Sequence, residues 1–165
     1  MKLIILIGCS GSGKTYFTNQ FLKKFPDWVV VSSDDYRLSR DGKVNFLNKP
    51  FSTFNTVDEL VLNALKDGKN VVYDACNLTR FRRSRLFSKL YKYRHHLKVI
   101  GVVFNTRFKT CVKQDKSKLR QHHVGRYNIF IMKVLAYINT PKMTEGFSIL
   151  TTPKSLYNIL KWLAF

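Results

Sequence analysis

Gly8-Cys9-Ser10-Gly11-Ser12-Gly13-Lys14-Thr15 is the stretch of this chain that decides its fold. It fits the phosphate-binding pattern G-x-x-x-x-G-K-[ST]. The apolar run Leu3-Ile4-Ile5-Leu6-Ile7, typical of a buried strand, precedes it, and residues 15–25 have a helical pattern. The glycines let successive N–H groups point at one anion, and the helix adds the positive end of its dipole. We therefore expect Lys14 to reach nucleotide phosphates and Thr15 to bind a magnesium ion. The alternative, a Gly/Ser-rich connection with a chance lysine, leaves the strand and helix on either side unexplained.

The composition indicates a single, strongly basic domain. The chain has 165 residues, enough to bury a full core, and no linker or repeat divides it, so we expect one domain over residues 1–165. Lys and Arg number 29 against 10 Asp and Glu, which gives a formal charge of +19. A field of that sign favours long polyanions over small neutral metabolites. A solubility surface or a generally basic proteome would give the same count, so charge alone leaves both open.

The three cysteines are Cys9, Cys76 and Cys111. Their odd number and the lack of a C-x-x-C spacing argue against a disulfide framework and against a zinc site. A reducing, intracellular setting fits best, either a cytoplasm of the organism itself or, for a phage or viral protein, that of its host. The opening apolar run is too short for a signal peptide, and no run approaches a membrane span, so we expect a soluble protein.

Strand-like and helix-like segments alternate along the rest of the chain. Strand patterns cover residues 28–32, 71–73, 99–104 and 148–151. Helical patterns cover residues 56–66, 80–94, 107–113, 125–138 and 153–165, and a loop rich in Gly, Asn and Pro spans residues 40–50. This alternation predicts an α/β fold with a parallel sheet of four to five strands and helices on both faces. Functional residues should then lie along the carboxyl edge of the sheet.

Three of these helices carry start signals. Thr56-Val57-Asp58-Glu59 is a capping box, which predicts a helix that begins there and continues to Lys66. Thr79 is expected to cap the next helix, which is strongly basic, and Pro153 suits the first turn of the last one.

Asp34 and Arg37 follow the second expected strand. If the chain turns helical there, positions i and i+3 face the same way and bring a carboxylate and a guanidinium together beside the phosphate loop. Asp34 could then accept the proton of an attacking hydroxyl while Arg37 grips a phosphate. The alternative is that Asp34 or Asp35 caps a helix and Arg37 pairs with it on the surface.

The phosphate loop, together with Ser33-Asp34-Asp35-Tyr36-Arg37 and Asp74-Ala75-Cys76-Asn77-Leu78, resembles the kinase domain of phage and bacterial polynucleotide 5′-hydroxyl kinases. The resemblance spans about the first 80 residues, and beyond them only the order of elements continues it. It implies a P-loop NTPase-type fold with a lid, ATP and Mg²⁺ as cofactors, and Asp34 as general base on a 5′-hydroxyl. Arg37 would contact the transferred phosphoryl group or the nucleotide's next phosphate, while Lys14 and Thr15 would hold the ATP phosphates and the metal.

The same resemblance implies that a lid after the fourth strand supplies an arginine to the triphosphate. The basic segment at residues 114–124 corresponds to it, with Arg120 as the candidate and Lys116 and Lys118 as substitutes. A cation there would meet the charge that develops on the phosphoryl oxygens. A solvated basic loop with no defined role is the alternative.

Asp74 and Asn77 follow the third expected strand, with Cys76 where the family has threonine. Asp74 could orient magnesium-bound water or the acceptor strand, and Asn77 would help to bind the acceptor. The alternative is that both side chains only fix the turn before Thr79. Cys76 offers a much weaker hydrogen bond than threonine.

The basic helix has several cations that could track a nucleic-acid backbone or form a plain solvated face. They are Arg80, Arg82, Arg83, Arg85, Lys89, Lys92 and Arg94. Four aromatic residues could stack on an unpaired base, although the sequence favours ordinary loop packing for each of them: Tyr36, Phe46, Phe51 and Phe54. The apolar chain end at residues 162–165 either docks on the sheet or meets a partner subunit.

Together these observations predict a kinase that transfers the γ-phosphoryl group of ATP to the 5′-hydroxyl end of DNA or RNA. The chain has no Asp-x-Asp-x-[ThrVal] phosphatase motif, so we expect kinase activity only, with a separate phosphatase or ligase partner and a homo-oligomer left open. One rival is a small-molecule kinase for a nucleoside, a sugar nucleotide or an antibiotic. Another is a non-catalytic nucleic-acid-binding module switched by nucleotide.

Overall fold

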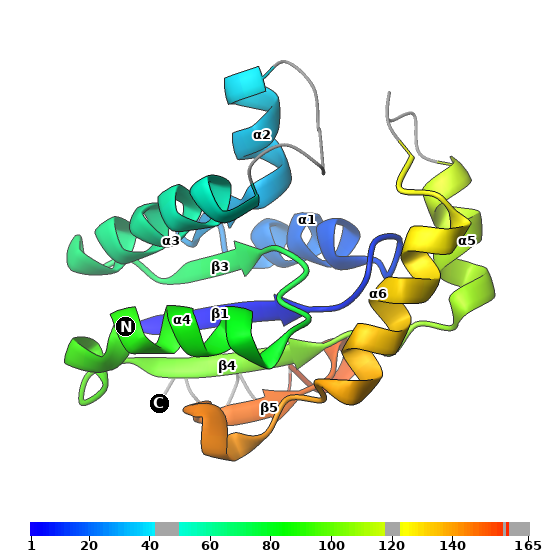
Figure 1. Ribbon diagram of the computed structural model, residues 1–165. Coiled ribbons are helices and arrows are strands. Elements are labelled where there is room, and N and C mark those ends of the chain that lie inside the picture. Colours follow the sequence, from blue (N-terminus) through cyan, green and yellow to red (C-terminus); the bar gives the residue numbers. More distant parts are fainter. Residues whose placement is uncertain (42–49, 118–122, 157, 159–165) are drawn as a thin grey trace.

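A five-stranded, all-parallel sheet organises the molecule (Figure 1). The computed structural model describes residues 1–41, 50–117, 123–156 and 158. The strands follow the order β2-β3-β1-β4-β5, and their bounds are β1 Lys2–Ile7, β2 Val29–Ser32, β3 Val71–Asp74, β4 Lys98–Val103 and β5 Ile149–Thr151. The predicted α/β class is therefore confirmed, with the strand of the opening apolar run at the centre of the sheet.

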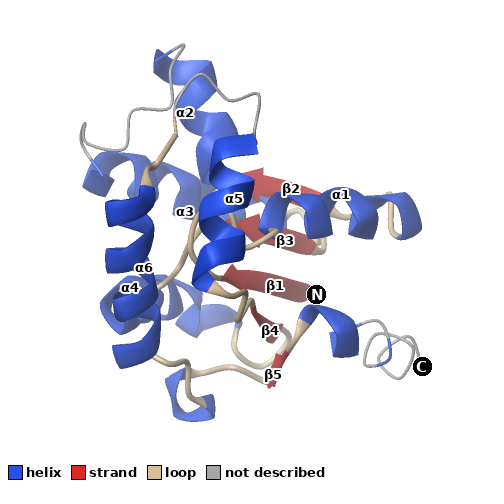
Figure 2. Ribbon diagram, turned by 90° about the vertical axis from the view of Figure 1, so that its right-hand side faces the viewer, coloured by secondary structure: helices blue, strands red, loops and turns tan. Residues whose placement is uncertain are grey.

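Helices cover both faces of the sheet, as predicted. Their bounds are α1 Lys14–Lys24, α2 Ser33–Asp41, α3 Pro50–Lys66, α4 Arg80–Leu90, α5 Phe108–Ser117 and α6 Arg126–Ile138, with short 3-10 turns η1 Tyr91–Tyr93 and η2 Met143–Glu145. Figure 1 shows α4 in front of the sheet and α1 behind it. Figure 2 shows the arrowheads of β1, β2 and β3 pointing to the side where α2, α5 and α6 lie. These elements therefore surround the carboxyl edge of the sheet.

The central strand β1 is buried on both faces because its side chains alternate between two cores. Leu3, Ile5 and Ile7 pack with apolar residues of α3 and α4. Ile4 and Leu6 pack on the other face with residues of α1. A continuous apolar run is what a strand covered on both sides requires, which is why five consecutive aliphatic residues stand directly before the phosphate loop.

The capping-box prediction is wrong. The helix α3 begins at Pro50 and not at Thr56, so the Thr56–Glu59 motif lies inside the helix. Asp58 does not serve a helix start: its buried carboxylate accepts hydrogen bonds from Tyr73 and Arg82. The Thr79 cap is confirmed, because its hydroxyl accepts a hydrogen bond from the Arg82 N–H at 3.2 Å.

Other boundaries differ from the predictions by a few residues. The helix α4 ends at Leu90 and continues as the 3-10 turn η1, while α5 extends to Ser117, beyond the predicted 107–113. Pro153 opens a helical turn whose Leu156 is fully buried, and the predicted remainder of that helix lies mostly outside the described residues. Within the described ranges, no helix combines the length and the apolar character needed to cross a membrane.

Candidate active site

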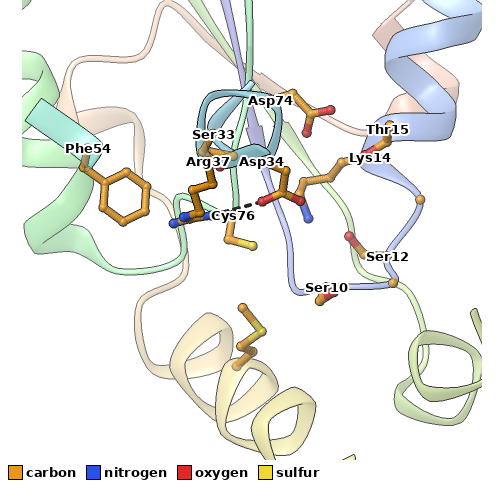
Figure 3. A pocket seen from close by; sticks show the side chains of 14 residues that line it. Ser10, Ser12, Lys14, Thr15, Ser33, Asp34, Arg37, Phe54, Asp74 and Cys76 are labelled. Atoms are coloured by element: carbon orange, nitrogen blue, oxygen red, sulfur yellow. Dashed lines mark hydrogen bonds and ion pairs between the residues drawn. The ribbon is translucent and has the colours of Figure 1, made fainter. Parts of the chain in front are cut away.

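A pocket lies where the phosphate loop meets the carboxyl ends of β2 and β3 (Figure 3). Its walls are residues 10–15 of the loop and first turn of α1, the start of α2, and residues 74–76 at the end of β3. Phe54 of α3 and Met132 of α6 complete the lining. The structure thus brings together the predicted loop, Asp34, Arg37 and Asp74, which come from three separate parts of the sequence.

The phosphate loop has the backbone of an anion site. Gly11 and Gly13 have φ angles of +71° and +97°, which favour glycine. Gly13 is the N-cap of α1, and no side chain caps that helix start. The N–H groups of the first turn therefore stay directed at the pocket, where the helix dipole also favours negative charge.

Lys14 is folded back onto the loop itself. Its Nζ donates hydrogen bonds to the carbonyl oxygens of Gly8 at 2.9 Å and Cys9 at 2.8 Å, and the residue is only 8% exposed. The ammonium group is thus held at the pocket wall without a carboxylate partner among these contacts. A triphosphate in the pocket would be the natural counter-charge for it.

Asp34 and Arg37 form an ion pair that belongs to the pocket and not to the outer surface. The predicted helical turn after β2 is present, because α2 begins at Ser33. Arg37 Nη1 lies 3.0 Å from Asp34 Oδ1 (Figure 3), with the Arg37 side chain 8% and the Asp34 side chain 31% exposed. Asp34 is therefore accessible from the pocket while its partner is fixed in place, which is the arrangement required of a positioned base and a phosphate-binding arginine.

Asp74 lies on the same side of the pocket as Thr15 (Figure 3). Burial raises the pKa of its carboxyl, against the positive charge of Lys14, and the Thr18 hydroxyl donates to Asp74 Oδ2 at 3.3 Å. A hydroxyl and one carboxylate are oxygen donors of the kind that hold Mg²⁺ together with nucleotide phosphates. The residues present thus fit a magnesium ion bound jointly with a nucleotide.

Asn77 does not line the pocket. Its amide donates to the carbonyl oxygens of Leu6 at 3.0 Å and Ala75 at 3.4 Å, and its φ of +46° makes it the turn residue after β3. This geometry agrees with the alternative in which Asn77 fixes the turn. Cys76 does line the pocket, and its carbonyl accepts a hydrogen bond from the Gly8 N–H at 3.0 Å. Burial raises the pKa of the Cys76 thiol.

Phe54 is one pocket residue to which the sequence gave an uncertain role. Its ring lies 5.6 Å from the Arg37 guanidinium and 4.5 Å from that of Arg82. Both cations are within cation–π range, so the ring supports arginines and does not stand free as a base-stacking platform. Of the other stacking candidates, Tyr36 is partly buried against the main core, while Phe46 and the Phe51 side chain lie outside the described residues.

Asp115 was missed by the sequence analysis. Its buried carboxylate accepts hydrogen bonds from the Ser10 hydroxyl at 3.4 Å and from the Gly125 N–H at 3.1 Å. It therefore joins the far end of the predicted lid segment to the phosphate loop. A signal was present, since Asp115 is the only acidic residue between Asp74 and Glu145.

The lid cations remain predictions. Lys116 is exposed at the end of α5, while Lys118 and Arg120 lie outside the described residues.

Two cations of α4 are turned into the protein and cannot track a nucleic acid. Arg82 binds the carboxylate of Asp58, with Nη1 2.9 Å from Oδ2, and also contacts the Tyr73 hydroxyl. Arg83 is fully buried and binds Glu145 through Nε at 2.7 Å and Nη2 at 2.9 Å. Of the predicted row, Arg80, Lys92 and Arg94 are exposed.

The sequence matches a known protein family. Residues 3–129 match the family described as AAA domain. The chain is 29% identical over 152 residues to the transcription factor bHLH140 of Arabidopsis thaliana. That match covers 88% of this chain but only 15% of the plant protein.

Solved structures show the same fold. A chain of the Pnkp1/Rnl/Hen1 RNA repair complex superposes with a TM-score of 0.69 and 25% identity, covering 84% of this chain and 44% of that chain. The deoxyadenosine kinase of M. mycoides with bound dATP superposes with a TM-score of 0.62 over 99% of both chains, at 12% identity. The chain therefore has a P-loop kinase fold, and it spans less than half of the RNA-repair chain that it matches.

Proposed function

We propose that this chain, which belongs to the AAA domain family and has a P-loop kinase fold, is a polynucleotide 5′-hydroxyl kinase. It would transfer the γ-phosphoryl group of ATP to the 5′-hydroxyl end of DNA or RNA. The observation that carries the proposal is the Asp34–Arg37 pair, 3.0 Å apart in the pocket that the phosphate loop lines. A loop alone would suit any nucleotide-binding protein, whereas a base beside it suits transfer to a hydroxyl.

In the proposed reaction, Asp34 accepts the proton of the 5′-hydroxyl group while the hydroxyl oxygen attacks the γ-phosphorus. Arg37 grips the transferred group, and Lys14 exchanges its loop carbonyls for phosphate oxygens and stabilises the charge of the transition state. Thr15 directly, and Asp74 through water, would hold Mg²⁺, which would neutralise charge on the phosphates. ADP leaves with the bond to the γ-phosphoryl group broken.

Charge supports a polynucleotide as the acceptor. The chain has a formal charge of +19, and three of its ten carboxylate residues, Asp58, Asp74 and Asp115, are buried. Three cations, Lys14, Arg37 and Arg83, are buried as well, so the surface of the described residues keeps the positive excess of the sequence count. The similarity to a chain of an RNA repair complex, at 25% identity, points to the same class of acceptor.

Labelled ATP tests the proposal directly. The protein is incubated with γ-labelled ATP, magnesium and, separately, a 5′-hydroxyl DNA oligonucleotide, the RNA equivalent, a nucleoside and a nucleoside 3′-phosphate. We expect label on an oligonucleotide 5′ end. Label on none of the four acceptors would contradict the proposal. Label only on the free nucleoside would favour a small-molecule kinase, such as the deoxyadenosine kinase that superposes over 99% of both chains.

A matched pair of variants tests the base. Asp34→Asn should lower the transfer rate by about 10²- to 10⁴-fold while ATP binding persists, because a general base contributes a factor of that order. Asp35→Asn is the control, since Asp35 is the neighbouring exposed carboxylate and does not line the pocket. Equal losses in the two variants would exclude Asp34 as the base. The non-catalytic switch module predicts a different result. The wild-type protein would then transfer no label but would bind nucleic acid, and this binding would survive Asp34→Asn.

A further inference from the structure

Two thiols from distant parts of the sequence face each other behind the phosphate loop. Cys9 Sγ and Cys111 Sγ lie 3.4 Å apart, and both residues are buried. Cys9 belongs to the loop itself, and Cys111 lies on α5, a hundred and two residues further along the chain. The proposed phosphoryl transfer uses neither sulfur atom, so the close approach of the two thiols calls for another account.

The two thiols differ in reactivity because one donates a hydrogen bond to the other. The hydrogen bond from Cys9 lowers the pKa of Cys111, with help from the charges of Lys133 and Lys14 and against the effect of burial. The same contact and burial raise the pKa of Cys9 far above its usual range. Since the thiolate is the reactive form of cysteine, the direction of these shifts favours Cys111 as the nucleophile and Cys9 as its resolving partner.

We propose that Cys9 and Cys111 are a covalent modification site at which peroxide forms a reversible disulfide between the phosphate loop and α5. The Cys111 thiolate attacks one peroxide oxygen, the O–O bond breaks and hydroxide leaves, giving a sulfenic acid on Cys111. Cys9 sulfur then attacks the Cys111 sulfur, the S–O bond breaks, and the oxygen leaves as water with the proton of Cys9. Two thiols and one peroxide thus give one disulfide and two waters.

A small oxidant can reach this buried pair because the apolar cluster around it is small. Among the described residues, the two cysteines and Ile129 of α6 are its buried members, and Phe108, Val112, Val124 and Met132 pack against them only partly buried. Most of α6 faces outward, with Tyr127 and Tyr137 74% and 83% exposed. A region with few buried apolar contacts opens locally at a lower free energy than the main core, so transient displacement of α6 can admit peroxide.

The disulfide would move the loop. An S–S bond is about 2.05 Å long, so the two sulfur atoms must approach by more than ~1 Å. The phosphate loop and α5 already pack closely there, because a Cβ on Gly11 would lie 2.2 Å from the Cys111 carbonyl oxygen. Cys9 also supplies one of the carbonyls that position Lys14. Oxidation is therefore expected to misplace the anion site, and an error of about 1 Å can cost up to ~10²-fold in rate.

Peptide mapping tests the bond itself, whatever the protein phosphorylates. The wild-type protein is treated with hydrogen peroxide, remaining thiols are alkylated, and trypsin is added. We expect the peptide Leu3–Lys14 joined to Thr110–Lys113 with the loss of two hydrogen atoms, while Asn70–Arg80 carries alkylated Cys76. Dithiothreitol should separate the pair. Alkylation of both Cys9 and Cys111, or a bond from either to Cys76, would overturn the proposal.

Nucleotide binding tests the consequence. Affinity for Mg-ATP is measured before and after peroxide, a readout that does not require kinase activity. Oxidised wild-type protein should bind at least about tenfold more weakly and recover with dithiothreitol. Cys111→Ser, which changes no pocket residue, should bind normally and keep its affinity after peroxide. Equal losses in wild type and Cys111→Ser would show that the disulfide is not the cause, and unchanged affinity of the cross-linked wild type would show that the bond does not act on the site.

Discussion

Gly11 and Gly13 both have positive φ angles, yet their surroundings differ. A Cβ on Gly13 would meet nothing within 4 Å, whereas one on Gly11 would collide with the backbone of Cys111. Gly13→Ala should therefore lower the free energy of unfolding by about 1–2 kcal/mol, the cost of the left-handed conformation. Gly11→Ala adds the steric clash and should cost clearly more. Urea denaturation of the two variants measures the difference, and equal costs would mean that α5 yields easily to the loop.

Phe54 makes a second prediction at the scale of one residue. Because its ring lies against the Arg37 guanidinium at 5.6 Å, Phe54→Leu should loosen the arginine and lower kcat/KM for phosphoryl transfer by about two- to fivefold, the value of one exposed cation–π contact. Phe54→Tyr keeps the ring and should retain the wild-type value. A loss in Phe54→Tyr as large as in Phe54→Leu would show that the ring face does not act.

The residues whose place in the pocket could be predicted lie in one motif, in one helical turn or at the end of a strand. Asp34 and Arg37 are three positions apart, so a single helical turn brings them together. Cys9 and Cys111, or Ser10 and Asp115, meet only because α5 packs against the phosphate loop. No local pattern encodes such a contact, since it depends on the position of a whole helix. The sequence therefore predicts the pocket wall made by the loop and α2 but not the contacts behind it.

At the scale of elements, the start of α3 shows how a local signal can mislead. The Thr56–Glu59 pattern satisfies a capping box, but α3 begins at Pro50. Arg82 of α4 and Tyr73 of β3 both donate hydrogen bonds to the Asp58 carboxylate, so the acidic residue inside the motif joins α3 to two other elements. Tertiary partners that lie far away in the sequence thus override a four-residue motif, while longer periodic runs such as β1 and α6 were predicted within a residue or two.

Arg83 and Glu145 join α4 to the turn η2 by a buried ion pair. Glu145→Gln would leave the fully buried Arg83 without its counter-charge and should lower the free energy of unfolding by about 3 kcal/mol. Arg83 also donates to the backbone carbonyl of Leu78 at 2.8 Å, so the cost should include loosening of the turn after β3. Denaturant unfolding at neutral pH measures it, and a cost near zero would show that water replaces the carboxylate.

The same pair gives a pH dependence. Burial alone would raise the pKa of Glu145, but the hydrogen bonds and charge of Arg83 outweigh it and hold the pKa below its usual value of 4.5. Protonation therefore favours the unfolded chain: the stabilisation is present above about pH 4.5 and is lost as pH falls through the lower, folded-state pKa. The difference in unfolding free energy between wild type and Glu145→Gln should shrink on acidification below about pH 4. A difference that stays constant to about pH 2 would contradict this assignment.

The charge of the whole molecule makes the broadest prediction. If a polynucleotide is the acceptor, its affinity for a protein of formal charge +19 must include release of counterions from the phosphates. Binding of a single-stranded oligonucleotide should weaken more than about tenfold between roughly 50 and 200 mM salt, with a linear log–log slope. A nucleoside 3′-phosphate, with one phosphate, is the matched control. The logarithm of its binding constant should fall with the logarithm of the salt concentration with a slope of about −1. Equal slopes for the two ligands would indicate that the positive surface is not a binding surface for long strands.

The strand order β2-β3-β1-β4-β5 also bears on how the chain reaches this structure. Of the five described strands, the central one, β1, is synthesised first, and its neighbour β4 begins only at Lys98. Until then the apolar side chains of β1, all almost fully buried in the finished protein, have no complete set of partners. Because such non-local, parallel pairing is reached late, contact order predicts slow folding with an aggregation-prone nascent chain. The strand that carries the phosphate loop is thus the one most in need of protection during synthesis.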